Sequence, residues 1–249
     1  MKRQHNLDMQ DIQLITEDSP FEYTEAYKTL RTNFNFMAFN GENRKILVTS
    51  AVPDEGKSSV VINLAISLAQ IGKRVLVVDG DLRNPSLHRY LNNKKDPERC
   101  LSALLTGSID FDSCIIETVH GFDLLPGGVV PPNPVELISS RQMNAVLEKA
   151  LETYDYVICD TPPIGIVTDA AALSALCDGV LFVLRHKTTR KNQVYGALRR
   201  LENVKANVLG VVLNHYDIGD VSGKGYGYYN SYSYGYGYGY GYGYGPYKK

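Results

Sequence analysis

The chain has 249 residues, a net charge of −1 and a pI near 6.5, so it is long enough for a sizeable α/β domain and is not expected to bind nucleic acid through a broad basic face. Its four cysteines, Cys100, Cys114, Cys159 and Cys177, lack the close spacing of metal or redox motifs, and reduced, buried thiols are expected. No apolar run approaches the roughly 20 residues of a membrane span and the N-terminus lacks the apolar core of a secretory signal, so a cytoplasmic protein is expected.

Apolar residues at Tyr27, Leu30, Phe34 and Met37 recur at helical spacing and predict an amphipathic helix over residues 22–38. Beyond it, near-continuous runs of Val, Ile and Leu alternate with helical patterns, which predicts an α/β fold with a mostly parallel sheet and helices on both faces. Strands are expected at 45–49, 74–79, 122–125, 156–160, 179–184 and 207–214, and helices near 58–71, 134–152, 168–177 and 190–203. The region 84–121 is less regular, and short helices and loops are expected there.

The segment 50–59, between the first strand and its helix, reads Ser-Ala-Val-Pro-Asp-Glu-Gly-Lys-Ser-Ser. In such a loop the backbone amides converge on an anionic group, Lys57 can reach the β and γ phosphates, and the Ser58 hydroxyl can ligate Mg²⁺. Ala51 replaces the first glycine of the usual pattern, and Gly-Lys-Ser also occurs by chance as a helix cap. The candidate nucleotide-binding residues are Pro53, Asp54, Glu55, Gly56, Lys57, Ser58 and Ser59.

Acidic residues follow two of the predicted strands. Asp79 and Asp81 stand one residue apart at the end of the second strand, and Asp160 ends the fourth. Carboxylates placed together repel unless a cation or an arginine lies between them, although an aspartate after a strand also caps turns. Because chemistry gathers at the carboxyl ends of parallel strands, Ser58, Asp79, Asp81 and Asp160 are predicted to hold Mg²⁺ beside a bound nucleotide.

The C-terminal segment is a near-alternation of Tyr and Gly that holds 11 of the 18 tyrosines. Without aliphatic residues after Val221 it cannot bury enough surface to order itself, so residues 223–249 are expected to form a flexible tail after a domain at 1–222. The tail is a candidate phosphate acceptor, and an adhesive low-complexity segment is the alternative. The candidate acceptors are Tyr226, Tyr228, Tyr229, Tyr232, Tyr234, Tyr236, Tyr238, Tyr240, Tyr242, Tyr244 and Tyr247.

Together these motifs resemble the bacterial tyrosine kinases of the capsule and exopolysaccharide type, in the separate cytoplasmic-subunit form of Gram-positive organisms. Residues 51–59 match that family's Walker A motif, 76–85 its Walker A′, 157–163 its Walker B, and the tail its autophosphorylation cluster. Partition ATPases of the ParA and MinD type share the fold but carry a lysine at the position of Val52 and lack a tyrosine tail. A nucleotide-dependent assembly ATPase with an adhesive tail remains the alternative function.

The resemblance implies a P-loop ATP-dependent protein-tyrosine kinase that uses Mg²⁺ and phosphorylates tail tyrosines in trans. Because a phenol must lose its proton during attack, Asp81 is the first choice for the general base and Asp79 the second. Arg83 either stabilises charge on the transferring group or pairs with Asp81. Asn214, at the end of the last strand, either reaches the adenine or forms a turn.

The resemblance also implies partners. Residues 25–31 resemble the family's Glu-x-x-Arg-x-x-Arg helix, with Glu25, Lys28 and Arg31 as the contacts of a ring of subunits, an octamer in this family. Lys28 stands where the first arginine is usual, and lysine keeps the charge without the bidentate fork. A membrane-embedded activator that recruits the chain to the inner face of the membrane, a tyrosine phosphatase, other protein-tyrosine substrates and control of polysaccharide synthesis and export are implied as well.

Overall fold

The computed structural model describes residues 12–37, 44–93 and 96–216. In these ranges a seven-stranded sheet has the order β3-β4-β2-β5-β1-β6-β7. All neighbouring strands are parallel except β3, which pairs antiparallel with β4 at one edge. The predicted mostly parallel α/β fold is therefore confirmed.

The strands are β1 (Lys45–Ser50), β2 (Val75–Asp79), β3 (Ile116–Glu117), β4 (Asp123–Leu125), β5 (Tyr156–Asp160), β6 (Gly179–Arg185) and β7 (Val208–Asn214). The helices are α1 (Phe21–Met37), α2 (Lys57–Ala69), α3 (Leu87–Tyr90), α4 (Leu101–Leu105), α5 (Phe111–Cys114), α6 (Pro134–Ile138), α7 (Arg141–Leu151), α8 (Asp169–Ser174) and α9 (Lys191–Asn203).

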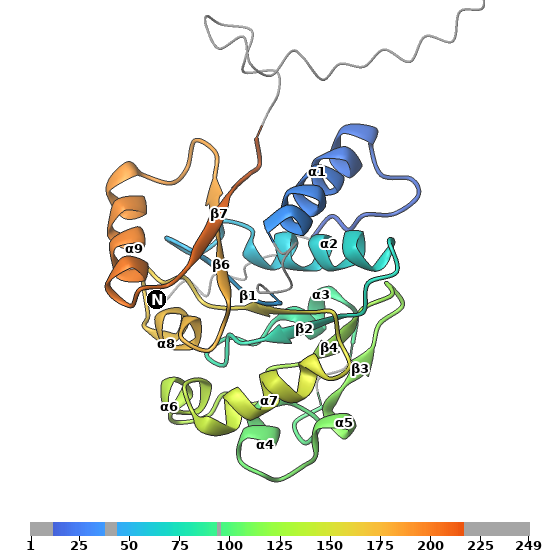
Figure 1. Cartoon of the computed structure of the whole chain (residues 1–249), viewed down its shortest axis with the longest axis vertical. Coiled ribbons are helices and arrows are strands. Elements are labelled where there is room, and N and C mark those ends of the chain that lie inside the picture. The colour runs from blue at the N-terminus through green and yellow to red at the C-terminus, as the bar shows by residue number, and fades with distance from the viewer. Residues whose placement is uncertain (1–11, 38–43, 94–95, 217–249) are drawn as a thin grey trace, which may run out of the picture. The chain divides into compact units, whose positions relative to one another are not determined.

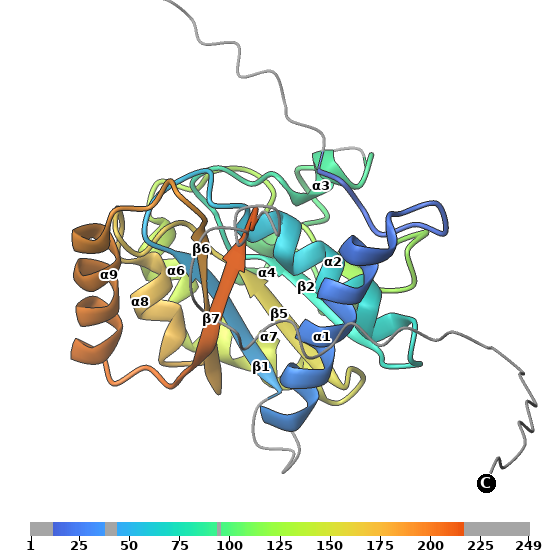
Figure 2. The ribbon, with the colours of Figure 1, turned by 90° about the horizontal axis from the view of Figure 1, so that it is seen from above.

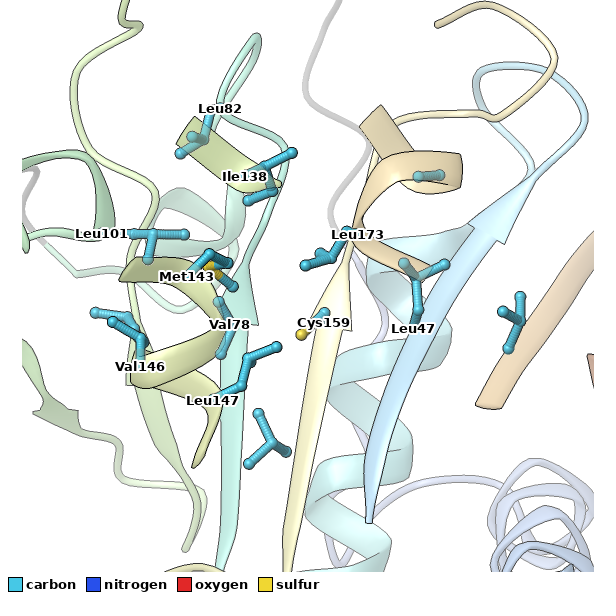
Figure 3. Close-up of a cluster of buried hydrophobic side chains, with 14 of the residues drawn as sticks. Leu47, Val78, Leu82, Leu101, Ile138, Met143, Val146, Leu147, Cys159 and Leu173 are labelled. Atoms are coloured by element: carbon cyan, nitrogen blue, oxygen red, sulfur yellow. The ribbon is translucent and has the colours of Figure 1, made fainter. Parts of the chain in front are cut away.

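Helices cover both faces of the sheet (Figure 1). On one face α1 and α2 lie together, and their apolar side chains, such as Phe34 and Leu64, pack against the sheet with none of their surface exposed. On the other face α4 to α9 form a second cluster. Figure 3 shows Met143 and Leu147 of α7 directed at Val78 and Cys159 of the central strands. Burial on both faces explains why β2 and β5 read as continuous apolar runs rather than alternating ones.

All six predicted strands and the helix ahead of the domain are present. The prediction of one helix over 134–152 is wrong, because α6 ends at Ile138 and α7 begins at Arg141. Ser140 has an extended backbone and its side chain accepts a hydrogen bond from the Met143 amide, so it starts a new helix as an N-cap. The irregular region contains α3, α4, α5 and the two-residue β3, which is too short to leave a pattern.

Chain contacts separate a compact unit, Met1–His215, from a second unit, Tyr216–Lys249. Only Tyr216 of the second unit is described, so the predicted boundary after residue 222 and the tail tyrosines lie outside the described residues. Within the described ranges, no helix combines the length and the apolar character that crossing a bilayer requires.

Candidate nucleotide-binding and catalytic site

The predicted nucleotide-binding and metal-binding residues lie at the carboxyl end of the sheet. β1, β2 and β5 are parallel neighbours, and the loop 51–56 leaves β1 there and leads into α2. Figure 2 shows the end of β7 close to the start of α2, and the side-chain amide of Asn214 donates a 3.0 Å hydrogen bond to the Glu55 carbonyl. The end of β6 also reaches the loop, where the Arg185 amide lies 3.5 Å from Glu55 Oε1.

The backbone of the loop explains how Ala51 replaces the usual glycine. The loop uses the left-handed region at Asp54 (φ 61°) and Gly56 (φ 83°), whereas Ala51 is not among the residues with positive φ. A methyl group at position 51 therefore meets no backbone conflict. Gly56 could not be exchanged in the same way, because an added Cβ would lie 1.9 Å from the Asn214 amide nitrogen.

Ser58 and two of the predicted aspartates are brought together. The Ser58 hydroxyl donates a 2.6 Å hydrogen bond to Asp160 Oδ2, and Asp79 is the register partner of Asp160 on the adjacent strand. Gly80 permits this close approach, since a Cβ there would lie 2.9 Å from the Asp160 carbonyl oxygen. Asp79 and Asp160 are buried, and Oδ1 of each has no hydrogen-bond partner among the described residues.

The surroundings of the three carboxyl groups favour their protonated forms. Burial raises the pKa of Asp79 to about 8, and the nearby Asp160 adds to the rise against hydrogen bonds from the Leu87 and Ser86 amides. Burial also raises the pKa of Asp160 to about 6, although the Lys57 ammonium and the Ser58 hydroxyl lower it. The pKa of Asp81 is raised by burial and lowered by the Asn84 amide and Lys57.

A cation suits these groups. Two buried carboxylate oxygens without partners beside a hydroxyl are hard oxygen donors of the kind that Mg²⁺ prefers, and a cation would reverse the pKa shifts. Across the described residues, no three His, Cys, Asp or Glu side chains form a metal cage by themselves. Mg²⁺ usually takes one or two protein carboxylates and completes its shell with waters and phosphates. The predicted metal set of Ser58, Asp79, Asp81 and Asp160 stays a prediction.

Arg83 has a partner that the sequence did not reveal. Its backbone amide bonds Asp81 Oδ1, but its guanidinium Nε lies 2.9 and 3.1 Å from the two carboxylate oxygens of Asp169. The predicted alternative of a side-chain pair with Asp81 is therefore wrong. Asp169 is the first residue of α8, and its side chain is 2% exposed. It therefore anchors the Arg83 guanidinium from the buried side, while 42% of the arginine side chain remains exposed. An aspartate at a helix start reads as an ordinary cap in sequence.

On the surface of α1, Lys28 pairs with Glu25 at 2.7 Å, whereas Arg31 turns inward and donates to the Ser67 carbonyl of α2 at 2.8 Å. Both members of the pair are partly exposed. The oligomerisation role of Glu25, Lys28 and Arg31 stays a prediction.

Comparison with known proteins places the chain among its relatives. The AAA domain family matches residues 44–215. The chain is 38% identical over 205 residues to tyrosine-protein kinase YwqD of Bacillus subtilis, an alignment that covers 82% of this chain and 85% of YwqD. The kinase domain of Escherichia coli tyrosine kinase ETK superposes with a TM-score of 0.76 at 34% identity, covering 87% of this chain and 88% of that domain.

The chain belongs to the bacterial tyrosine-protein kinases. It is also 37% identical to tyrosine-protein kinase wzc of Salmonella typhimurium, but there the alignment covers 81% of this chain and 28% of that kinase. The cell division ATPase MinD of Pyrococcus furiosus has a lower TM-score of 0.60 at 27% identity. The bacterial tyrosine kinases use ATP with Mg²⁺, which agrees with the loop and the carboxyl groups described above.

Proposed function

We propose that this ATP-dependent tyrosine kinase phosphorylates the tail tyrosines of an adjacent copy and thereby controls capsular or exopolysaccharide synthesis and export. The observation that carries the proposal is that the phosphate loop, Lys57 and the carboxyl groups of Asp79, Asp81 and Asp160 meet at one end of the sheet. The acceptors are the eleven tyrosines from Tyr226 to Tyr247.

Different residues of the site are proposed to bind the phosphates, to fix the loop and to bind the metal ion. The triphosphate lies across residues 53–59, with the amides of the loop and Lys57 holding its phosphates, and Asn214 fixes the loop at the Glu55 carbonyl. Ser58, Asp79, Asp81 and Asp160 would hold Mg²⁺, directly or through waters, and the bound ion would supply neutralisation of phosphate charge. Asp79 is fully buried and takes two backbone amides, so it suits ion binding better than contact with an incoming side chain.

Asp81 is the better general base because it is only partly buried and one of its oxygens, Oδ1, accepts both the Arg83 and Asn84 amides. Its other oxygen is left to take the proton of the tyrosine hydroxyl. The phenol oxygen then bonds to the γ phosphorus, the bond to the bridging oxygen breaks, and ADP leaves. Arg83, held by Asp169, stabilises charge on the transferring group.

The assembly and its partners complete the proposal. A ring of subunits, an octamer in the resembling family, places the tail of one copy near the loop of the next, and the surface pair Glu25–Lys28 supports a contact on α1. A membrane-embedded activator brings the protein to the inner face of the membrane, and a tyrosine phosphatase reverses the modification. Other protein tyrosines are further substrates.

A mixing experiment tests transfer in trans. One protein carries Lys57→Met with its natural tail, and the other has an intact loop with every tail tyrosine changed to phenylalanine. With labelled ATP and Mg²⁺, base-stable label on the Lys57→Met protein that a tyrosine phosphatase removes is the expected result. Label on neither protein, with free phosphate released instead, would overturn the proposal in favour of an assembly ATPase.

A further inference from the structure

The phosphate loop contains a buried acid whose side chain bonds within the loop and to the segment after β6. The side chain of Glu55, two residues before Lys57, has no exposed surface. One carboxylate oxygen, Oε2, accepts the backbone amide of Val52 at 2.9 Å, so it closes the loop on itself. The other oxygen, Oε1, points out of the loop toward the segment that joins β6 to α9.

That segment provides two hydrogen-bond donors, a hydroxyl and a backbone amide. The Thr189 hydroxyl donates to Glu55 Oε1, and the Arg185 amide lies 3.5 Å from the same oxygen. The Arg185 guanidinium also donates to the Asp54 carbonyl at 3.1 Å. With the bond from Asn214 to the Glu55 carbonyl, the ends of β6 and β7 hold the first half of the loop from one side.

A buried carboxylate at this position carries a cost that needs an explanation. An anion taken out of water is unfavourable unless hydrogen bonds compensate it, and here it also stands in a loop that receives a polyanion. The hydrogen bonds from Thr189 and Val52 supply that compensation, and they hold residues 52–55 in the one conformation that includes the left-handed backbone of Asp54. Without them the free loop would have more conformations to lose when a nucleotide binds.

We infer that Thr189 is a positioning residue for nucleotide binding, which acts through the Glu55 carboxylate to keep the phosphate loop in its receiving conformation. Thr189 lies outside every nucleotide-binding motif of the sequence. The inference depends on the proposed function in one respect, which is that this loop binds the nucleotide. Because Thr189 shapes the free loop rather than the transferring group, its loss weakens binding more than it slows transfer.

The test uses Thr189→Val, which removes the hydroxyl and keeps the shape, with Thr189→Ser as the variant that restores it. Thr188→Val is the matched control, since the Thr188 hydroxyl donates to the His186 carbonyl and Thr188 lies on the same segment. We expect Thr189→Val to raise the Kd for Mg²⁺-ADP and the KM for ATP about tenfold, the loss expected for one hydrogen bond to a charged group. Its kcat should stay within about twofold of wild type, and the two other variants should bind as wild type does.

Equal ADP affinity of Thr189→Val and wild type would overturn the inference while leaving the kinase intact, whereas failure of wild type to bind ADP would overturn the proposed function itself. A fall in the kcat of Thr189→Val with an unchanged KM would also overturn the inference about Thr189, because that result indicates a general structural role. A Glu55→Ala background adds a second check. If Thr189 acts through Glu55, Thr189→Val has no further effect there.

Hydrogen exchange of the nucleotide-free wild-type protein tests the same loop contacts without any substitution, so it can be measured even if a variant fails to fold. The Val52 amide, bonded to Glu55, should exchange at least tenfold more slowly than an unprotected loop amide. Exchange of Val52 at the unprotected rate would overturn the inference without any substitution.

Discussion

The Ser58 hydroxyl donates a 2.6 Å hydrogen bond to Asp160 Oδ2 and so joins the first turn of α2 to the end of β5. Ser58→Ala removes a donor from a buried carboxylate whose other oxygen already lacks a partner in the described part of the chain. We expect the Mg²⁺ concentration that gives half-maximal kinase activity to rise roughly 10- to 100-fold, as is usual when a supporting group of a metal site is lost. Ser58→Thr keeps the hydroxyl and serves as the control. A magnesium titration in which the alanine variant follows wild type would refute the role of this hydroxyl.

Asp79 should lower the stability of the nucleotide-free protein increasingly as the pH rises. Its folded pKa, raised to about 8, exceeds the ordinary value of 3.8, so the folded state holds a proton that the unfolded state releases. The cost of this buried group is absent below about pH 4, grows as the pH rises, and is complete above pH 8. Asp79→Asn has no such proton to lose, so it should gain stability over wild type as the pH increases.

Urea unfolding in the presence of a chelator at pH 5 and at pH 8 measures this difference. Asp160, with its pKa raised to about 6, changes stability in the same direction in both proteins, so the comparison between the two reports Asp79 together with its interaction with Asp160. A difference in unfolding free energy that stays constant from pH 5 to pH 8 would show that Asp79 is ionised throughout.

Arg83 and Asp169 allow stability and catalysis to be separated. Arg83→Ala leaves a carboxylate that is 2% exposed without its partner and should lower the free energy of unfolding by about 1–3 kcal/mol. The double variant with Asp169→Ala should regain most of that stability. If Arg83 stabilises charge on the transferring group, kcat stays low in the double variant. Recovery of kcat together with stability would mean that Arg83 serves only to pair Asp169.

Gly80 separates Asp79 from Asp81 and sets how closely two strand ends approach. Its amide donates to the Asp160 carbonyl at 2.8 Å, and a Cβ would lie 2.9 Å from that oxygen. Gly80→Ala should therefore lower the unfolding free energy by about 1–3 kcal/mol through a shift of β2 against β5. Gly196→Ala is the control, because a Cβ on this α9 glycine meets nothing within 4 Å. It should raise the unfolding free energy by about 0.5–1 kcal/mol in the same denaturation series.

The sequence predicts the fold well because most of its signals are local. Continuous Val, Ile and Leu runs such as 75–78 and 157–158 reflect burial on both faces of the central strands β2 and β5. The break between α6 and α7 was missed because Ser139 and Ser140 are tolerated within helices, and whether a serine caps or continues a helix depends on packing.

The site was predicted from its motifs, but its supporting contacts were not. Asp79, Asp160 and Ser58 lie in recognisable segments, whereas Asp169 and Thr189 reach the site from α8 and from the segment after β6. These contacts join residues 86 and 134 positions apart, and in a single sequence no periodicity or spacing links such residues. Asn214 was expected at the site, and its bond to the Glu55 carbonyl gives it a role in holding the loop.

Phosphorylation should loosen the assembly that we propose. Residues 223–249 carry Lys224, Lys248 and Lys249 and no acidic side chain, and each phosphorylated tyrosine adds roughly −1.5 to −2 charges. Several modified tyrosines make the tail strongly anionic, so tails gathered in one ring repel one another. We expect phosphorylated wild type to have a lower native mass than Lys57→Met protein, and the difference to shrink as salt screens the repulsion. Native mass spectrometry and light scattering measure it. A protein with all tail tyrosines changed to phenylalanine, incubated with ATP, should keep the larger mass, and equal masses for the phosphorylated and Lys57→Met proteins would defeat the idea.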